Sequence, residues 1–312
     1  MSKVAIVGAG AVGTAIAYAA QIRGVCRQIA LFDLNAQKVR AETLDLNHGM
    51  QFTPMAEITG SDDLAVCTGA DVVVITAGAK QHPGQSRLDL AAANVAMCRE
   101  LVPALVALAP DALLVVVTNP VDVVTMATLE FSELPAHRVF GSGTVLDSSR
   151  LRFLIAEHTR VAVQNVHAYI AGEHGDSEVP LWSTATIGGV PVEDWESEGV
   201  GRLDAEARTR IHERVVTAAY EIIAGKGATS LAIGLSVSRV LQAVLHDEHR
   251  VLPVTSRLDG THGLSGVCLS MPSVVGRSGV ERVLATPLDA DERNRLAASA
   301  DAVRSTARSL GL

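Results

Sequence analysis

The sequence predicts an α/β fold, in which a Rossmann-like, doubly wound parallel sheet is followed by an α+β domain. Short runs of β-branched and apolar residues alternate with Ala- and Leu-rich segments over the first 140 residues. Such continuous apolar strands are typical of a parallel sheet that helices cover on both faces. A glycine-rich turn from Gly8 to Gly13 joins the first strand-like run to the first helical segment, as expected at the start of this fold.

The elements of the first domain follow from this alternation. Strands are expected where short apolar runs occur, at 3–7, 28–32, 71–76, 112–118 and 137–140. Helices are expected in the Ala- and Leu-rich stretches at 12–24 and 89–108. These elements predict a first domain over residues 1–141.

The second half of the chain has a mixed character. Longer helical patterns cover 204–225, 228–245 and 290–310, and strand-like runs cover 250–256, 266–274 and 280–285. This mixture predicts a second, α+β domain over residues 142–312.

Composition excludes several classes of function. The net charge is −8 with interspersed signs, which argues against a nucleic-acid surface. The apolar runs of about ten residues or fewer are too short to span a bilayer, and no signal peptide is recognisable, so a cytoplasmic protein is expected. The four cysteines lie far apart without a Cys-x-x-Cys pair, which predicts buried thiols and neither a metal site nor a disulfide framework.

The glycine-rich turn indicates a dinucleotide site. Gly8, Gly10 and Gly13 follow a predicted strand and open a predicted helix, and Asp33 ends the next strand, twenty residues after Gly13. The glycines allow a tight turn, close approach of a pyrophosphate and close helix packing, while the helix N-terminus attracts phosphate. A carboxylate at Asp33 accepts hydrogen bonds from a ribose diol and repels a 2′-phosphate, so NAD is favoured over NADP. The alternative is a glycine turn with a purely structural purpose.

Three further segments carry candidate site residues. The segment "IAGEHGDSEVP" holds His174 between glycines, "GSGTVLDSSRLRF" places Asp147 and Arg150 on one face if a helix begins there, and "VVVTNPVDVV" places Asn119 at the carboxyl end of a strand. On this evidence alone, a histidine such as His174 is more often a solvated turn residue or a structural histidine than a catalyst. Asp147 and Arg150 are equally compatible with ordinary helix charges.

The motifs "GAGAVG", "TNPVDV", "GSGTVLDSSRLRF", "GEHGDS", "GKGATSLAIG" and "GVERVL" occur in this order along the whole chain. In this order they resemble the lactate/malate dehydrogenase family. The resemblance implies an NAD-dependent enzyme that interconverts pyruvate and (S)-lactate. It also implies that the helix around 227–245 packs back on the cofactor domain.

The same resemblance implies the roles of individual residues. His174 would be the proton donor and acceptor, Asp147 would hold its other ring nitrogen, and Arg150 would clamp the substrate carboxylate. Thr229 and Asn119 would line the substrate pocket. The implied NAD-binding residues are Gly8, Gly10, Val12, Gly13, Asp33, Gly78, Asn119 and Ile233.

The polar stretch "AGAKQHPGQSR" after the third strand resembles the mobile lid of this family. Gly78 and Gly84 would give it freedom, and Arg87 would swing in to polarise the substrate carbonyl. Gln81 is the discriminating residue, because the family has Arg there in malate dehydrogenases and Gln in lactate dehydrogenases. A dicarboxylate closed under Gln81 would bury an unpaired charge, whereas pyruvate would not.

The resemblance also implies a regulatory site and an assembly. Arg152 and His167 match positions at which bacterial relatives bind fructose 1,6-bisphosphate across a subunit interface of a homotetramer. The alternative, that both are interface or surface charges without regulation, stays open. Competing functions are a dehydrogenase for malate or a bulkier 2-hydroxy acid, and a non-catalytic NAD-binding protein.

Overall fold

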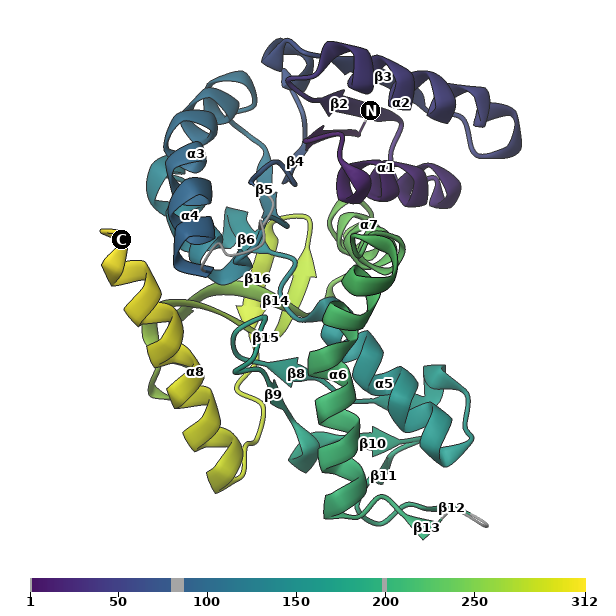
Figure 1. Ribbon diagram of the computed structural model, residues 1–312, viewed down its shortest axis with the longest axis vertical. Coiled ribbons are helices and arrows are strands. Elements are labelled where there is room, and N and C mark those ends of the chain that lie inside the picture. Colours follow the sequence, from purple (N-terminus) through teal and green to yellow (C-terminus); the bar gives the residue numbers. More distant parts are fainter. Residues whose placement is uncertain (1, 80–86, 198–200) are drawn as a thin grey trace.

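The computed structural model describes residues 2–79, 87–197 and 201–312. In its first half, six parallel strands are joined by helices in the spatial order β3-β2-β1-β4-β5-β6 (Figure 1). The strand order reverses between β1 and β4, which is the doubly wound arrangement that the sequence predicts. The strands are β1 (Lys3–Val7), β2 (Gln28–Phe32), β3 (Glu57–Ser61), β4 (Val72–Ile75), β5 (Leu113–Val116) and β6 (Val139–Gly141).

Four helices accompany these strands. They are α1 (Ala11–Arg23), α2 (Ala36–His48), α3 (Arg87–Leu108) and α4 (Val121–Ser132). The sequence predicts α1 and α3 as examples of the helices that alternate with the strands, whereas α2 and α4 were not named. The side chain of Asn35 caps α2 by accepting a hydrogen bond from the backbone amide of Lys38, which is a common start signal for a helix.

The sheet does not end at β6. Three antiparallel strands, β14 (Arg250–Asp259), β15 (Ser265–Gly276) and β16 (Gly279–Val283), extend it to nine strands in the described part of the chain. The three strand-like runs predicted in the second half thus form strands, and they also pair with the sheet of the first half, where Gly141 of β6 is opposite Thr255 of β14. A Cβ atom at Gly141 would lie 2.7 Å from Thr125 Oγ1 and 3.1 Å from Thr255 Cβ, so a side chain has no room there.

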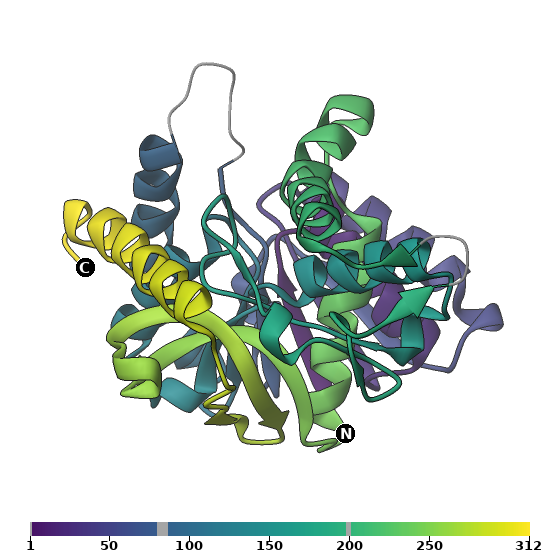
Figure 2. The same ribbon diagram turned by 90° about the horizontal axis from the view of Figure 1, so that it is seen from below.

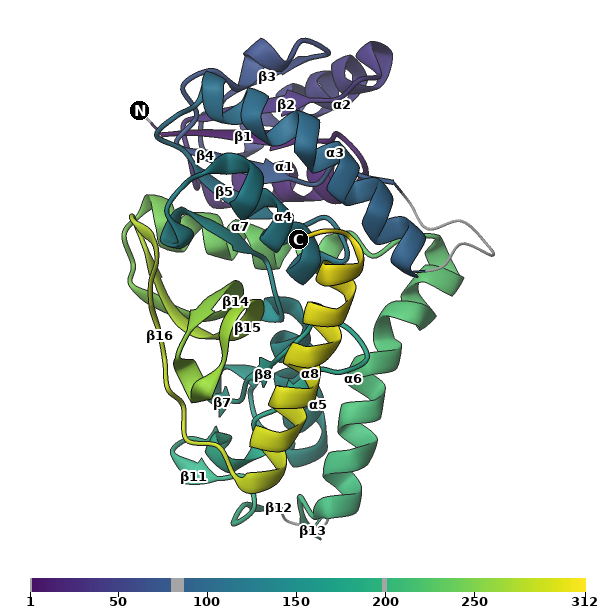
Figure 3. The same cartoon turned by 90° about the vertical axis from the view of Figure 1, so that its left-hand side faces the viewer.

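Most of the remaining elements lie in the lower half of Figure 3, together with β14, β15 and β16. The long helices among them are α5 (Val145–Thr159), α6 (Ala205–Lys226) and α8 (Ala290–Ser309), and α8 lies across the β14–β15 hairpin (Figure 2). A separate core gathers around Leu151, Ile155 and Ile187. The short strands are β7 (Val166–His167), β8 (Ile170–Ala171), β9 (Val179–Pro180), β10 (Thr186–Ile187), β11 (Val190–Pro191), β12 (Glu196–Ser197) and β13 (Gly201–Arg202).

Helix α7 (Leu231–Leu245) leaves this second half and packs against α1 of the first (Figure 1). The contact is close because a Cβ atom at Gly234 would lie 2.6 Å from the carbonyl oxygen of Ala15. The segment that follows α6 is thereby brought to the glycine-rich turn that precedes α1.

One helix in the described residues, Leu88–Leu108, is long and apolar enough to span a membrane by length and composition. It packs against α4, and Val95, Cys98 and Leu105 of this helix are buried in the core beside the sheet. The apolar character of the helix is thus explained by its position as a core helix of the parallel-sheet half.

The four cysteines, Cys26, Cys67, Cys98 and Cys268, are free and buried, which confirms the prediction of buried thiols. Burial raises the pKa of Cys26 to about 12 and that of Cys98 to about 11. The thiols therefore stay protonated at neutral pH, and a protonated thiol is a poor nucleophile.

Candidate active site

The glycine-rich turn has the shape that a phosphate group requires. Gly8 adopts a φ of 106°, and a Cβ atom there would lie 2.7 Å from the amide nitrogen of Ala77. At Gly13 a Cβ atom would collide with the carbonyl oxygen of Gly8. At Gly10, in contrast, the nearest atom is the Lys38 Nζ at 4.0 Å. Packing therefore explains Gly8 and Gly13, whereas the absent side chain at Gly10 leaves space in front of the N-terminus of α1.

Asp33 lies beside this turn at the end of β2. Its Oδ2 accepts a hydrogen bond from the amide of Ala9 at 2.9 Å, and its Oδ1 accepts one from the amide of Asn35 at 3.0 Å. These bonds orient the carboxylate at the position from which it could meet a ribose diol.

The carboxyl ends of β4 and β5 are held together by a buried side chain, Asn94 of α3. Its Oδ1 accepts the amide hydrogen of Ala79 at 2.8 Å, and its Nδ2 donates to the carbonyl of Asn119 at 2.7 Å. Gly78 packs so closely that a Cβ atom would lie 2.5 Å from Thr118 Cγ2. Asn119 itself is exposed at this edge of the sheet, where ligands bind in folds of this class.

His174 and Asp147 form a close pair. The loop between β8 and β9 carries His174, and its Nδ1 lies 2.5 Å from Oδ2 of Asp147 in the first turn of α5. The Asp147 side chain is 2% exposed and that of His174 is 26% exposed. No residue in the described ranges hydrogen-bonds to the second ring nitrogen, Nε2. A histidine held through one nitrogen, with the other free, can exchange a proton with a ligand.

The charges of this pair support each other. The pKa of His174 is raised to about 9, mainly by the negative charge of Asp147, although burial acts in the opposite direction. Burial would raise the pKa of Asp147, but the neighbouring charges and hydrogen bonds of His174 and Arg150 lower it below its ordinary value. At neutral pH the pair is therefore an imidazolium beside a carboxylate.

Arg150 lies one helical turn after Asp147, as predicted for a helix in this segment, and α5 begins at Val145. Its Nη1 donates to Asp147 Oδ1 at 2.8 Å. Within the described ranges, its Nε and Nη2 make no hydrogen bond. Those two donors have the spacing that a bidentate contact to a carboxylate needs.

Asp122 was not predicted as a site residue, but its side chain contacts the backbone of His174. Asp122 is 2% exposed in the first turn of α4. Its Oδ2 accepts the backbone amide hydrogen of His174 at 2.8 Å, and its Oδ1 accepts the Thr255 hydroxyl at 2.6 Å. Burial raises the pKa of Asp122 to about 6. Its sequence signals were its place two residues after Pro120 at a strand end and its position within the motif "TNPVDV".

The other expected site residues are placed as follows. Val12 and Ile233 pack half-buried against one core cluster, and Thr229 lies in the loop between α6 and α7. Arg87 opens α3, and Gln81 lies outside the described residues.

Arg152 and His167 lie on adjacent elements. Arg152 of α5 donates through Nε to the carbonyl of Ala168 at 2.8 Å, and its guanidinium carbon stacks 4.7 Å from the centroid of the Tyr169 ring. His167, in β7, is exposed. Arg152 is thus tied to the residue that follows His167 in the chain.

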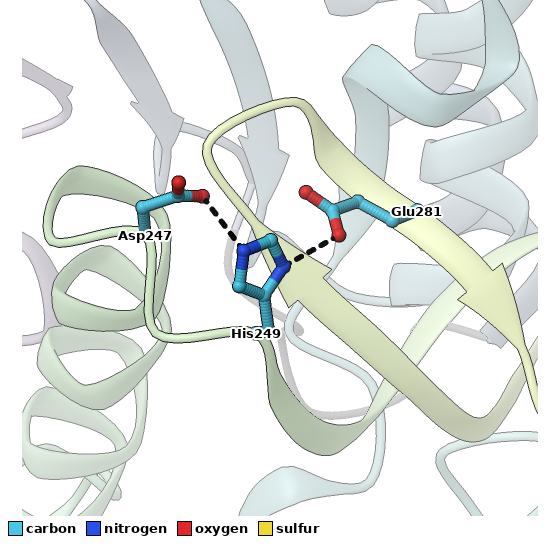
Figure 4. A group of neighbouring side chains, drawn as sticks. All are labelled: Asp247, His249 and Glu281. Atoms are coloured by element: carbon cyan, nitrogen blue, oxygen red, sulfur yellow. Dashed lines mark hydrogen bonds and ion pairs between the residues drawn. The ribbon is translucent and has the colours of Figure 1, made fainter.

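A second group of titratable side chains lies away from this site, where the turn after α7 meets β16 (Figure 4). His249 Nδ1 is 2.8 Å from Glu281 Oε2, and its Nε2 is 3.6 Å from Asp247 Oδ1. The pKa of His249 is raised, and the largest cause is its hydrogen bond to Glu281. Because the two ring nitrogens face different carboxylates, the arrangement suits an imidazolium that joins the turn to the strand.

Comparison with protein families decides what kind of enzyme has this arrangement. Residues 2–141 match the model described as "lactate/malate dehydrogenase, NAD binding domain", and residues 144–309 match "lactate/malate dehydrogenase, alpha/beta C-terminal domain". The chain belongs to the lactate/malate dehydrogenase family. The predicted resemblance and the predicted NAD-binding fold are thereby confirmed.

Individual members of the lactate/malate dehydrogenase family are similar over the full length. An L-lactate dehydrogenase from Bifidobacterium animalis subsp. lactis is 55% identical over 311 residues, which cover 99% of this chain and 97% of that protein. An L-lactate dehydrogenase from Bacillus caldolyticus is 44% identical, with 97% and 96% covered. The crystal structure of the minor L-lactate dehydrogenase from Enterococcus mundtii in a ligand-bound form has a TM-score of 0.94 at 40% identity, with 99% and 98% covered.

Proposed function

We propose that this chain is an NAD-dependent L-lactate dehydrogenase, which interconverts pyruvate, NADH and a proton with (S)-lactate and NAD⁺. The observation that carries the proposal is that His174 and Arg150 both contact the buried carboxylate of Asp147. The set supplies a proton donor and a carboxylate clamp from neighbouring positions, as a 2-oxo acid requires.

The residues around the glycine turn fit NAD. The open Cβ position at Gly10 gives the pyrophosphate access to the N-terminus of α1, and Asp33 is oriented beside it. Ile233 offers the nicotinamide an apolar surface, which favours the neutral reduced ring over the charged oxidised one. When bound, NADH supplies the hydride.

The proton comes from His174. In its charged form the imidazolium donates from Nε2 to the keto oxygen of pyruvate, and in the reverse direction the neutral ring accepts a proton from the lactate hydroxyl. Asp147 fixes the tautomer and stabilises the charge through Nδ1. Asp122 keeps the backbone of His174 in place, and the pair Nε and Nη2 of Arg150 binds the substrate carboxylate.

Substrate choice is assigned to the lid. We assign polarisation of the keto group to Arg87, the choice between a methyl group and a second carboxylate to Gln81, and the lining of the pocket to Asn119 and Thr229. An unpaired buried charge costs several kcal/mol, so even ~4 kcal/mol against oxaloacetate gives about a thousandfold discrimination. The runner-up function, malate oxidation, would need a cation for the second carboxylate at the position that we assign to the neutral side chain of Gln81.

The role of Asp33 predicts which coenzyme binds. We expect NADH to bind at least about tenfold more tightly than NADPH, because the carboxylate repels a 2′-phosphate, and ~1.4 kcal/mol already gives a factor of ten. Equilibrium titration of nicotinamide fluorescence with both coenzymes measures this ratio. Equal affinities, or tighter NADPH binding, would show that Asp33 does not read the ribose.

We assign Arg152 and His167 to a fructose 1,6-bisphosphate site at a subunit interface of a homotetramer. Cations that repel one another across a two-fold axis are released from repulsion when an anion binds between them. We expect the sugar bisphosphate to raise the rate severalfold at pyruvate concentrations below KM, and the variant Arg152→Gln to lose that response. A rate that does not change with the effector would contradict this assignment.

The two halves of the chain have different proposed functions. We assign residues 1–141 to cofactor binding and 142–312 to substrate binding, with the helix around 227–245 completing the cofactor side through α7. The proposed compartment is the cytoplasm.

The experiment that tests the activity is product analysis. Purified protein is incubated with pyruvate and NADH, and the product is resolved by chiral chromatography. (S)-lactate in amounts equal to the NADH consumed supports the proposal. (R)-lactate, or binding of NADH without any turnover, would refute it, and the latter result would favour a non-catalytic NAD-binding protein.

A further inference from the structure

Two buried polar side-chain atoms, one from the loop that carries His174 and one from α6, lie close to each other without a hydrogen bond in the described part of the chain. Glu178 Oε1 and His212 Nε2 are 3.8 Å apart, and neither atom has a hydrogen-bond partner among the residues that the structure describes. The Glu178 side chain is 3% exposed. A buried polar atom without a hydrogen-bond partner is destabilising, so we consider these two atoms as one pair.

The pair connects two parts of the proposed site. Glu178 ends the loop that carries His174 and precedes β9, and His212 lies in the middle of α6. Two turns further along α6, the Tyr220 hydroxyl donates to Asp176 of the same loop at 3.0 Å. Helix α6 then leads directly to Thr229. A contact between Glu178 and His212 therefore ties the proton donor to the segment that lines the far side of the pocket.

Burial determines the protonation states of Glu178 and His212. Burial raises the pKa of Glu178 to about 8 and lowers that of His212 to about 4. A protonated carboxyl group beside a neutral imidazole supplies one donor and one acceptor, so a single hydrogen bond would satisfy both atoms once their 3.8 Å separation shortens.

Charged groups face Glu178 from three sides. Asp147 and Arg150 approach from α5, His174 from the loop, and Arg295 from α8, where its Nη2 donates to the Glu178 carbonyl at 3.3 Å. The negative charge of Asp147 favours the protonated form of Glu178, and the three cations oppose it. Conversely, an ionised Glu178 favours the charged form of His174.

We propose that Glu178 and His212 share one buried proton and act as a positioning pair, which ties α6 to the His174 loop and tunes the charge of His174. The kinetic consequence depends on the proposed dehydrogenase activity; the shared proton itself does not. At neutral pH the pair is uncharged. At higher pH it releases its proton, and the new carboxylate keeps His174 protonated over a wider range.

The test uses two variants and a matched control. Glu178→Gln keeps the volume and a donor but cannot ionise, and His212→Phe keeps a ring but removes the acceptor. Glu157→Gln makes the same chemical change in the exposed ion pair between Glu157 of α5 and Arg214 of α6. Infrared spectra at pH 7 report a protonated carboxyl group through its carbonyl stretch, and pH profiles of pyruvate reduction report His174.

We expect a carboxylic acid band in the wild type that is absent from Glu178→Gln and shifted to higher frequency in His212→Phe. We also expect Glu178→Gln to lose activity at lower pH than the wild type, with roughly a threefold deficit at pH 9 relative to pH 7, and Glu157→Gln to match the wild type. An active enzyme in which Glu178→Gln leaves both the band and the profile unchanged would overturn the inference. A band without pyruvate turnover would instead overturn the dehydrogenase activity and keep the shared proton.

Discussion

Replacing His174 by alanine is expected to lower kcat for pyruvate reduction by about a thousandfold or more, since general acid catalysis contributes about 10²–10⁴-fold and the Asp147 carboxylate is left buried without its imidazolium. NADH affinity should stay unchanged, because His174 is assigned to the substrate side. Stopped-flow turnover and fluorescence titration measure the two quantities. His249→Ala removes a histidine from the distant cluster of Figure 4 and is the matched control. A variant of His174 with near-normal kcat would contradict its role.

The pH dependence of the two directions follows from the same residue. Asp147 raises the pKa of His174 to about 9, so the proton-donating form predominates below that pH and is lost above it. For the free enzyme, kcat/KM for pyruvate should therefore be flat near neutrality and fall as pH rises through about 9. Lactate oxidation needs the neutral ring and should rise over the same interval. Profiles measured in both directions that shared one optimum would contradict this account.

Replacing Arg150 by lysine is expected to lower kcat/KM for pyruvate by about a hundredfold, mostly through KM. A lysine ammonium cannot make two parallel hydrogen bonds to a carboxylate, and each charge-assisted bond contributes about 1.5–3 kcal/mol. The lost contact to Asp147 Oδ1 at 2.8 Å adds to the effect.

Steady-state kinetics with Arg210→Lys as control measures this change, because Arg210 makes an exposed ion pair with Glu206 on α6. An Arg150→Lys variant with an unchanged KM would show that another residue binds the substrate carboxylate.

Local patterns made much of the site predictable. The glycine turn and Asp33 are set by short-range spacing, and the structure joins Asp33 to that turn through Ala9. Asp147 and Arg150 lie three residues apart, so a helix alone brings them together. Contacts between distant segments were not predictable in this way. Asp122 meets the amide of His174 across 52 positions, and nothing in either segment indicates the other.

The fold shows the same division between local and distant information. The five strands expected in the first domain form, whereas α4 was missed because its sequence "VDVVTMATLEFS" is rich in β-branched residues, which are typical of strands. The strands of the second half were expected in their own lobe. Their pairing with β6 depends on Gly141 meeting Thr255, and strand pairing across more than 100 positions leaves no local signal.

The central claim is that this site reduces pyruvate with NADH and rejects dicarboxylates, and it is tested most directly by one measurement. The rate of NADH oxidation by the purified protein is followed with pyruvate and with oxaloacetate in parallel, over the same concentrations and at pH 7. The account predicts a kcat/KM for pyruvate about a thousandfold higher, from ~4 kcal/mol of unpaired charge under Gln81. A higher kcat/KM for oxaloacetate would contradict it and make malate the substrate of the reverse reaction.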